Sequence, residues 1–226
     1  ATDVKEQDLV RDLFITNNLN TLLFFTDKGK CFQLKTYQLP LEQRYSRGKA
    51  IINLLKLEEN EKVNTLLPIN KFDESYLIFI TKNGIIKKTK LNEYENPRSS
   101  GLHAIKLLEK DELVNVILSS GNDEIIIATK FGLASHFNEK DITSVGRNSV
   151  GVRGIRLNQG DNVIGMEKIT SNSTLLTITR NGYGKRTNVN EYRLIKRGGK
   201  GVTNILTKYQ KENSRIHFNN SSQTRY

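Results

Sequence analysis

The sequence predicts an all-β chain, a propeller-like array of about four repeats of roughly fifty residues each. The first observation behind this prediction is a motif that occurs four times: an apolar run followed by Thr, two mostly polar residues and Gly. Its anchor glycines are spaced 55, 48 and 50 residues apart, at Gly29, Gly84, Gly132 and Gly182. The second observation is that no stretch of twelve or more residues shows clear helical periodicity.

Two further landmarks recur in step with the anchor glycines. A second glycine follows each anchor by 19, 17, 19 and 19 residues, at Gly48, Gly101, Gly151 and Gly201. An acidic residue recurs at spacings of 53, 50 and 50, at Asp8, Glu61, Asp111 and Asp161. Because Asp side chains commonly bond to the backbone of turns, we interpret Asp111 and Asp161 as turn formers rather than catalytic acids.

Each unit carries the pattern of four short strands. Apolar runs meet at Asn83-Gly84 and at Asn181-Gly182, and an Asn-Gly turn between such runs predicts a β-hairpin whose Gly has a positive φ. A third strand is predicted after the second glycine, at 50–54, 152–157 and 202–206. A fourth is predicted after the acidic landmark, at 63–67, 114–118 and 163–166. Four strands in about fifty residues match one blade of a propeller-like array.

The landmarks divide the chain into one domain and a tail. We expect the domain to span residues 1–210, with a partial unit at 1–20 and repeats near 21–70, 71–119, 120–170 and 171–210. Residues 211–226 are polar and are expected to form a disordered tail. Since residues 1–20 hold only the end of a unit, we expect the array to be cut from something larger on its N-terminal side.

The composition favours a polyanionic partner. The chain has 35 Lys and Arg residues against 24 Asp and Glu residues, a formal net charge of +11, and such an excess attracts nucleic acid or acidic membrane surfaces. The single cysteine, Cys31, excludes an intrachain disulfide and a Cys-based zinc site, and we expect no metal or cofactor. The longest apolar runs have four residues, too short to cross a bilayer, so we expect no membrane association.

The segment 195–201 is the main candidate for phosphate contact. Its glycines allow sharp turns that bring backbone N–H groups close to a partner, and its cations supply charged donors. The residues are Lys196, Arg197, Gly198, Gly199, Lys200 and Gly201. The alternative is a basic connecting loop with no ligand.

Other basic residues recur with the repeat and predict a curved positive stripe that could bend a DNA duplex. Those in the hairpin arms are Lys87, Lys88, Lys185 and Arg186. Those around the second glycines are Arg44, Arg47, Lys49, Arg98, Arg147, Arg153 and Arg156. The alternative is that they only keep the surface solvated. No recognition helix is predicted, so we expect contacts with the DNA backbone rather than with base edges.

Longer strings carry a resemblance to a known family. They include Tyr37-Gln38-Leu39-Pro40, Ile52-Asn53-Leu54-Leu55, Gly151-Val152-Arg153-Gly154-Ile155-Arg156-Leu157 and Asn181-Gly182-Tyr183-Gly184-Lys185-Arg186-Thr187. With these strings in order and at repeat spacing, residues 1–205 resemble the C-terminal domain of bacterial DNA gyrase A. The related topoisomerase IV subunit has a similar, more degenerate domain, and the string at 181–187 favours gyrase.

The resemblance implies a β-pinwheel, in which Greek-key blades exchange strands with their neighbours. It implies a non-catalytic domain that binds double-stranded DNA and wraps it around a basic rim, so that the holoenzyme introduces negative supercoils. The partners implied are the rest of gyrase A and gyrase B. The catalytic tyrosine and the ATPase would lie elsewhere in this ATP-dependent type IIA topoisomerase, which works on the nucleoid in the bacterial cytoplasm.

The sequence departs from the family in the placement of its hallmark box, Gln-Arg-Arg-Gly-Gly-Lys-Gly, which usually lies in the first blade. The nearest string here is at 195–201 in the last unit, and it matches five of seven positions. Either the chain begins after the usual box, which we favour, or a later blade has taken over its role. Two alternatives to wrapping therefore stay open: a module that tethers or bends DNA without chiral wrapping, as in topoisomerase IV, and a propeller-like scaffold for protein interactions.

Overall fold

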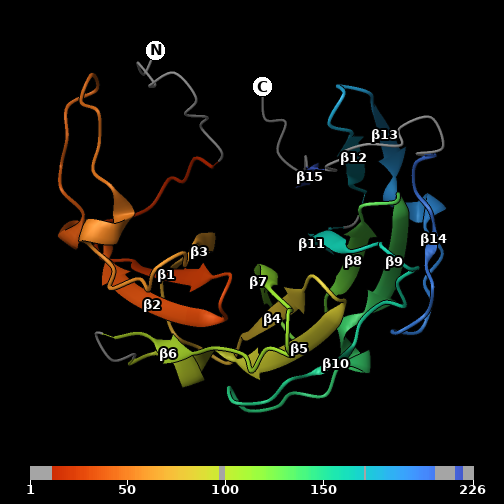
Figure 1. Ribbon diagram of the computed structural model, residues 1–226, viewed down its shortest axis with the longest axis horizontal. Helices are drawn as coiled ribbons and strands as arrows, with labels where there is room; N and C mark the ends of the chain where they lie inside the picture. The colour runs from red at the N-terminus through yellow and green to blue at the C-terminus, as the bar shows by residue number, and fades with distance from the viewer. Residues whose placement is uncertain (1–11, 97–99, 171, 207–216, 221–226) are drawn as a thin grey trace.

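The computed structural model describes residues 12–96, 100–170, 172–206 and 217–220 of the 226-residue chain. Their strands form four antiparallel sheets that follow one another along an open arc (Figure 1). The helical segments are 3₁₀ turns of three or four residues: η1 (Thr36–Gln38), η2 (Ile51–Asn53), η3 (Leu91–Tyr94), η4 (Glu139–Asp141) and η5 (Val189–Glu191). The described part of the chain is therefore all-β, as the sequence predicts.

Each sheet is built on one of the predicted hairpins. The first sheet has the order β3-β1-β2-β6, with β1 (Thr21–Thr26), β2 (Lys30–Lys35), β3 (Val63–Ile69) and β6 (Leu102–His103). The second has the order β10-β5-β4-β7, with β4 (Tyr76–Thr81), β5 (Ile85–Lys90), β7 (Leu113–Ser119) and β10 (Val152–Arg153). The third has the order β11-β8-β9-β14, with β8 (Glu124–Thr129), β9 (Leu133–Asn138), β11 (Val163–Ile169) and β14 (Val202–Thr203). The fourth has the order β13-β12-β15, with β12 (Thr174–Ile178), β13 (Gly184–Asn188) and β15 (His217–Asn220).

The outer strand of each of the first three sheets comes from the next unit, where units one to four are the repeats anchored at the four glycines of the hairpins. Strand β6 of unit two pairs with β2, β10 of unit three pairs with β5, and β14 of unit four pairs with β9. Neighbouring blades therefore exchange strands, as the resemblance implies.

The strand predicted at 50–54 is wrong. Ile51–Asn53 form η2 instead, and Ile52 is 59% exposed. In the described part of the chain no sheet edge pairs with this segment. An extended strand without a partner would leave its backbone groups unpaired, so the segment takes a compact turn.

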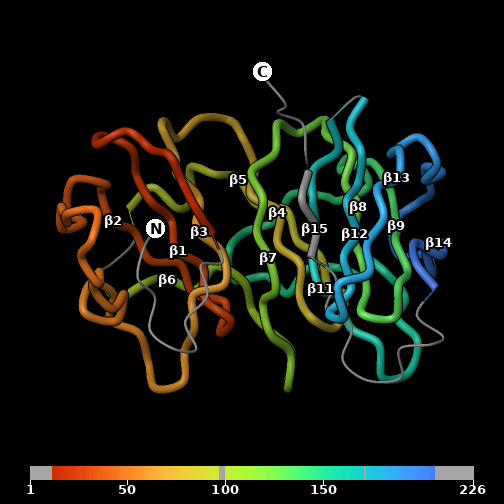
Figure 2. The backbone as a smooth tube through the Cα atoms, turned by 90° about the horizontal axis from the view of Figure 1, so that it is seen from above, coloured from red at the N-terminus to blue at the C-terminus, as the bar shows by residue number. Residues whose placement is uncertain are grey.

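The inner strands lie side by side through the centre of the arc (Figure 2). Strand β7 contacts β3 on one side and β11 on the other, and β11 also contacts β15. Asparagine side chains cross two of these gaps: Asn64 Nδ2 donates to the Leu113 carbonyl at 2.5 Å, and Asn115 Nδ2 donates to the Met166 carbonyl at 2.9 Å. The inner strands thus join successive units directly.

The core lies between neighbouring sheets. Phe25 of the first sheet meets Phe79 of the second edge to face, with ring centroids 5.6 Å apart, and Tyr94 packs against both rings. Between the second and third sheets, buried isoleucines of β4 and β5 pack against Ile127 and Phe137. Because both faces of an interior sheet are covered, consecutive residues of β4 and β5 are buried rather than alternately buried and exposed.

The anchor glycine and the acidic landmark of a unit close its hairpin turn. Gly84 has a φ of +81°, which favours glycine, and the turn N–H of Asn83 donates to Asp111 Oδ1 at 2.9 Å. Asp161 Oδ1 accepts the N–H of Phe131 at 2.9 Å in the same way. Asp111 and Asp161 are thus turn residues, as the sequence predicts.

The disordered tail expected at 211–226 is contradicted at residues 217–220, and its other residues, 211–216 and 221–226, lie outside the described part of the chain. Residues 217–220 form β15 and pair with the inner edge of β12. Strands β3, β7 and β11 occupy this place in the other sheets. The open edge of β12 offers backbone hydrogen bonds to any extended segment, and these bonds do not depend on apolar side chains.

We expect Gly151→Ala to destabilise the fold by about 3 kcal/mol, as the sum of positive-φ strain and a clash. Gly151 has a φ of +100°, and a Cβ there would lie 2.5 Å from the Ile86 carbonyl oxygen. Gly48, at the equivalent position of unit one, has a φ of +72° with open space around it, so Gly48→Ala should cost only about 1 kcal/mol. Urea denaturation of both variants measures the difference, and equal losses would contradict the proposed close approach at Gly151.

Candidate nucleic-acid interface

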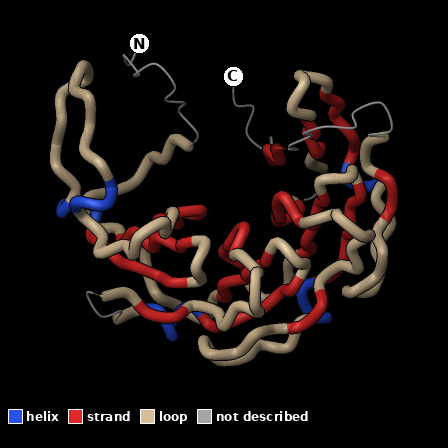
Figure 3. The backbone as a smooth tube through the Cα atoms, viewed as in Figure 1, coloured by secondary structure: helices blue, strands red, loops and turns tan. Residues whose placement is uncertain are grey.

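The segments around the second glycines form what we call the rim loops, residues 41–57, 100–107, 143–157 and 193–206. Three of them carry the exchanged strands β6, β10 and β14. These three follow the convex edge of the arc, which consists mainly of loops (Figure 3). The first rim loop, drawn in orange in Figure 1, extends away from its sheet.

Most of the cations predicted around the second glycines are exposed. They are Arg44, Arg47, Lys49, Arg153, Arg156, Lys196 and Lys200. Lys49 Nζ lies 3.8 Å from Glu42, and the Arg44 guanidinium lies 5.5 Å from the centroid of the Tyr45 ring. Because they project from loops at the edge of the arc, these side chains can reach a partner without unfolding any sheet.

Three exposed cations on the rim loops, Lys56, Lys106 and Arg193, were missed by the sequence reasoning. Lys56 and Lys106 occupy the position of Arg156, which is exposed as well. The signal that could have found these two lysines is the recurring pattern apolar-cation-Leu at 55–57, 105–107 and 155–157. In units two and three the main-chain N–H of this residue donates to the next rim loop, Lys106 to the Ser149 carbonyl and Arg156 to the Gly199 carbonyl.

The Gly-rich loop at 195–201 rests on the rim loop of unit three. Gly198 N–H donates to the Gly154 carbonyl at 2.8 Å, and a Cβ at Gly201 would lie 2.5 Å from the Ala134 carbonyl oxygen. The N–H of Gly198, which the sequence suggests for a phosphate, is therefore already used within the fold. Lys196 and Lys200 are exposed, whereas Arg197 is half-buried.

Two more predicted cations lie on the outer strand of the fourth sheet. Lys185 and Arg186 of β13 are exposed and pair in register with Thr177 and Leu176 of β12. Among the described residues no strand pairs with the other edge of β13. Their side chains are thus open to solvent beside the convex edge.

Lys87 is buried, so it does not belong to the exposed surface. Its side chain is 0% exposed, and its ammonium donates to the Arg147 carbonyl at 2.7 Å and to the Ala104 carbonyl. These carbonyls belong to the rim loops of units three and two. Burial lowers the pKa of Lys87 to about 7, although the nearby Glu93 carboxylate opposes this shift.

Lys88 is also buried, so the exposed role predicted for it is wrong as well. Its Nζ lies 3.1 Å from Glu139 Oε2 and 4.4 Å from the centroid of the Tyr76 ring. The Glu139 carboxylate also accepts the Ser119 hydroxyl at 2.7 Å and the Asp123 N–H at 2.6 Å. The Lys88–Glu139 ion pair therefore connects units two and three.

The equivalent residue of unit three also connects two units. His136, four residues after its anchor glycine like Lys88, has Nδ1 2.7 Å from the Tyr192 carbonyl and Nε2 2.8 Å from Glu124. Of the remaining predicted cations, Arg147 is half-buried beside Glu93, and Arg98 lies outside the described residues.

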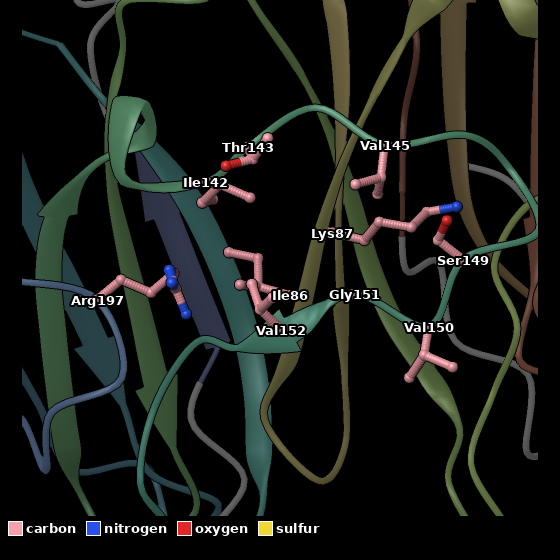
Figure 4. A pocket seen from close by; sticks show the side chains of 10 residues that line it. All are labelled: Ile86, Lys87, Ile142, Thr143, Val145, Ser149, Val150, Gly151, Val152 and Arg197. Atoms are coloured by element: carbon pink, nitrogen blue, oxygen red, sulfur yellow. The ribbon is translucent and has the colours of Figure 1, made fainter.

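A cavity of about 220 Å³ opens where units two, three and four meet (Figure 4). Ile86 and Lys87 line it from β5, the rim loop of unit three contributes Val145 and Ser149, and Arg197 closes the opposite side. Its walls are mainly apolar, and the Lys87 ammonium is already bonded to carbonyls. The cavity therefore lies where the rim loops of units three and four meet.

The described residues contain neither a candidate metal site nor a candidate membrane-spanning helix. No group of three or more His, Cys, Asp and Glu side chains there is placed to hold a metal ion. No helix of the described residues is long and apolar enough to span a membrane.

Known proteins match this chain over most of its length. The family described as DNA gyrase C-terminal domain, beta-propeller, matches residues 20–70, 75–120, 123–170 and 173–218. The chain is 41% identical over 206 residues to the DNA gyrase A protein of Escherichia coli (strain K12), covering 91% of this chain and 24% of that protein. It is 49% identical over 203 residues to the DNA gyrase A protein of Clostridium acetobutylicum, covering 89% and 24%. The chain thus spans about a quarter of the length of these relatives.

Solved structures show the same architecture. The C-terminal domain of DNA topoisomerase IV superposes with a TM-score of 0.82 at 31% identity, covering 91% of this chain and 65% of that one. The DNA gyrase A C-terminal domain superposes with a TM-score of 0.76 at 26% identity, covering 88% and 64%.

We expect the stability of the chain to rise between pH 7 and pH 8.5 because of Lys87. Its folded-state pKa is about 7, below the 10.5 of an unperturbed lysine. In this range the unfolded chain keeps the proton that the folded chain releases, so the free energy of unfolding rises with pH, by about 2 kcal/mol at pH 8.5. Urea denaturation of the parent and of Lys87→Met across this range isolates the effect. Parallel pH profiles for the two proteins would contradict it.

Proposed function

The chain belongs to the family of DNA gyrase C-terminal domains, and from this membership we propose that it binds double-stranded DNA along its rim loops. The observation that carries the proposal is the set of exposed cations on these loops, at equivalent positions in successive units: Lys56, Lys106 and Arg156. A row of cations attracts the DNA backbone and releases counterions when it neutralises phosphates.

The interface suits phosphates better than base edges. The described residues contain no α-helix that could enter a major groove. The exchanged strands on the rim are only two residues long. Binding should therefore tolerate sequence differences, while the deformability of the DNA still biases it.

We further propose that the bound duplex bends along the convex edge and that this helps a gyrase holoenzyme to introduce negative supercoils. The chain would be non-catalytic, with gyrase B and the rest of gyrase A as its partners in the bacterial cytoplasm. It covers 24% of the length of the Escherichia coli relative, which leaves space for a catalytic tyrosine elsewhere.

A second candidate is a module that tethers or bends DNA without chiral wrapping. The superposition on the topoisomerase IV C-terminal domain, with a TM-score of 0.82, favours it. A scaffold for protein interactions is the remaining alternative, and it predicts no salt-dependent binding of DNA.

We expect Lys196→Ala combined with Lys200→Ala to weaken duplex binding and to lower the salt slope by about 2, since each phosphate contact contributes about 0.9 to the slope. Fluorescence anisotropy of a labelled duplex, titrated at several NaCl concentrations, measures both quantities. The matched control is Lys62→Ala combined with Lys71→Ala, which removes two exposed lysines outside the rim loops. The proposed interface is excluded at this loop if the two double variants show the same slope.

We expect chiral wrapping to change the linking number of a nicked plasmid that is sealed in the presence of the chain. The shift should have the sense of positive writhe and scale with protein, because a wrapped duplex carries fixed writhe when it is ligated. Gel electrophoresis of the sealed topoisomers measures it. Binding without a shift favours the tethering candidate, and no binding at low salt overturns the DNA-binding proposal.

A further inference from the structure

An arginine recurs four residues before the second glycine in three of the rim loops, at Arg44, Arg147 and Arg197. In the two loops that rest on a preceding unit, its main-chain N–H points to an acidic side chain of that unit. Arg147 N lies 3.3 Å from Glu93 Oε2, and Arg197 N lies 3.4 Å from Asp141 Oδ2.

The acidic partners are equivalent residues, because each lies nine positions after the anchor glycine of its unit. Glu93 belongs to η3 of unit two, and Asp141 belongs to η4 of unit three. The same junction is thus built twice from the same positions of the repeat. A cation that served only to keep the surface solvated would not need such an acidic partner.

The Arg197 side chain is also directed to the preceding unit. Its Nε donates to the main-chain carbonyl of Asp141 at 3.0 Å, and its Nη1 donates to that of Arg153 at 2.8 Å. The planar guanidinium thereby ties η4 and β10 to the Gly-rich loop, with a fork geometry that an ammonium group lacks.

Arg147 holds the other junction with its backbone and its side chain. Its Nε lies 3.9 Å from Glu93 Oε2, and its carbonyl accepts the ammonium of Lys87 at 2.7 Å. Both arginines are half-buried, whereas Arg153, Arg156, Lys196 and Lys200 on the same loops are exposed. The loops therefore contain two kinds of cation.

We propose that Arg147 and Arg197 are positioning residues, which fix each rim loop on the preceding unit, and that the exposed cations of these loops contact the phosphates. This inference rests on the proposed binding of DNA. Without Arg197 the rim loop of unit four can shift relative to that of unit three. The number of phosphate contacts then stays the same, but the path that the loops impose on the duplex is lost.

A variant of Asp141 distinguishes the two possible roles of Arg197, contact with a phosphate and positioning of the rim loop. If Arg197 contacts a phosphate, Asp141→Ala removes a nearby negative charge and strengthens binding. If Arg197 positions the loop, Asp141→Ala removes an acceptor of the junction and acts in the same direction as Arg197→Gln. Arg197→Lys adds a second criterion, because an ammonium keeps the charge but does not reproduce the fork.

The experiment measures duplex affinity at several salt concentrations, together with DNA bending from energy transfer between dyes at the two duplex ends. We expect Arg197→Gln, Arg197→Lys and Asp141→Ala each to reduce bending and to weaken binding several-fold, with the salt slope unchanged. The matched control, Lys196→Gln, removes the same charge from the adjacent residue. It should lower the slope by about 1 and keep the bend.

The inference is overturned if Arg197→Lys behaves like the parent, Arg197→Gln lowers the slope by about 1, and Asp141→Ala strengthens binding. The equivalent Glu93→Ala provides an independent test at the other junction, where a loss of bending supports positioning and tighter binding contradicts it. Failure of the proposed function is distinguishable, because Lys196→Gln would then also leave affinity and slope unchanged.

Discussion

The outer edge of each hairpin in the first three sheets is covered by a strand that belongs to the next unit, and the rest of the structure depends on this pairing. Strands β2, β5 and β9 would otherwise present unpaired N–H and carbonyl groups. None of the first three units is therefore complete by itself. The contact of Phe25 with Phe79 between sheets has the same consequence, since stability arises at the interfaces between repeats.

This topology decides where a positive charge can be exposed. A cation on an interior hairpin lies between two sheets and must find partners there, as Lys87 does with carbonyls and Lys88 does with Glu139. A buried charge without such partners would cost several kcal/mol. The rim loops lie along the outer edge of the sheets, so Arg156 and Lys200 can extend into solvent. The array can therefore expose cations where the exchanged strands cross from one unit to the next.

The sequence predicts the features that a single unit determines. The positive φ of Gly84 and the turn role of Asp111 follow from local backbone geometry, and both are confirmed. The burial of Lys87 and Lys88 could not be predicted, because consecutive residues of a strand with both faces covered are both buried, and alternation then carries no information. The turn at η2 and the pairing of β15 depend on which sheet edges are open, and a local pattern does not contain that information.

The same hydrogen bonds that join the units also hold the cations proposed to meet DNA. Lys106 is exposed, yet its main-chain N–H donates to the Ser149 carbonyl of the next rim loop, so the backbone that carries its side chain is held on unit three. Bending a duplex by 40–90° costs about 1–6 kcal/mol in total. Opening a single junction would break several hydrogen bonds of about 1 kcal/mol each and would expose apolar core. On the proposed function, the duplex therefore adapts to the arc, and the curvature of the DNA is set by the protein.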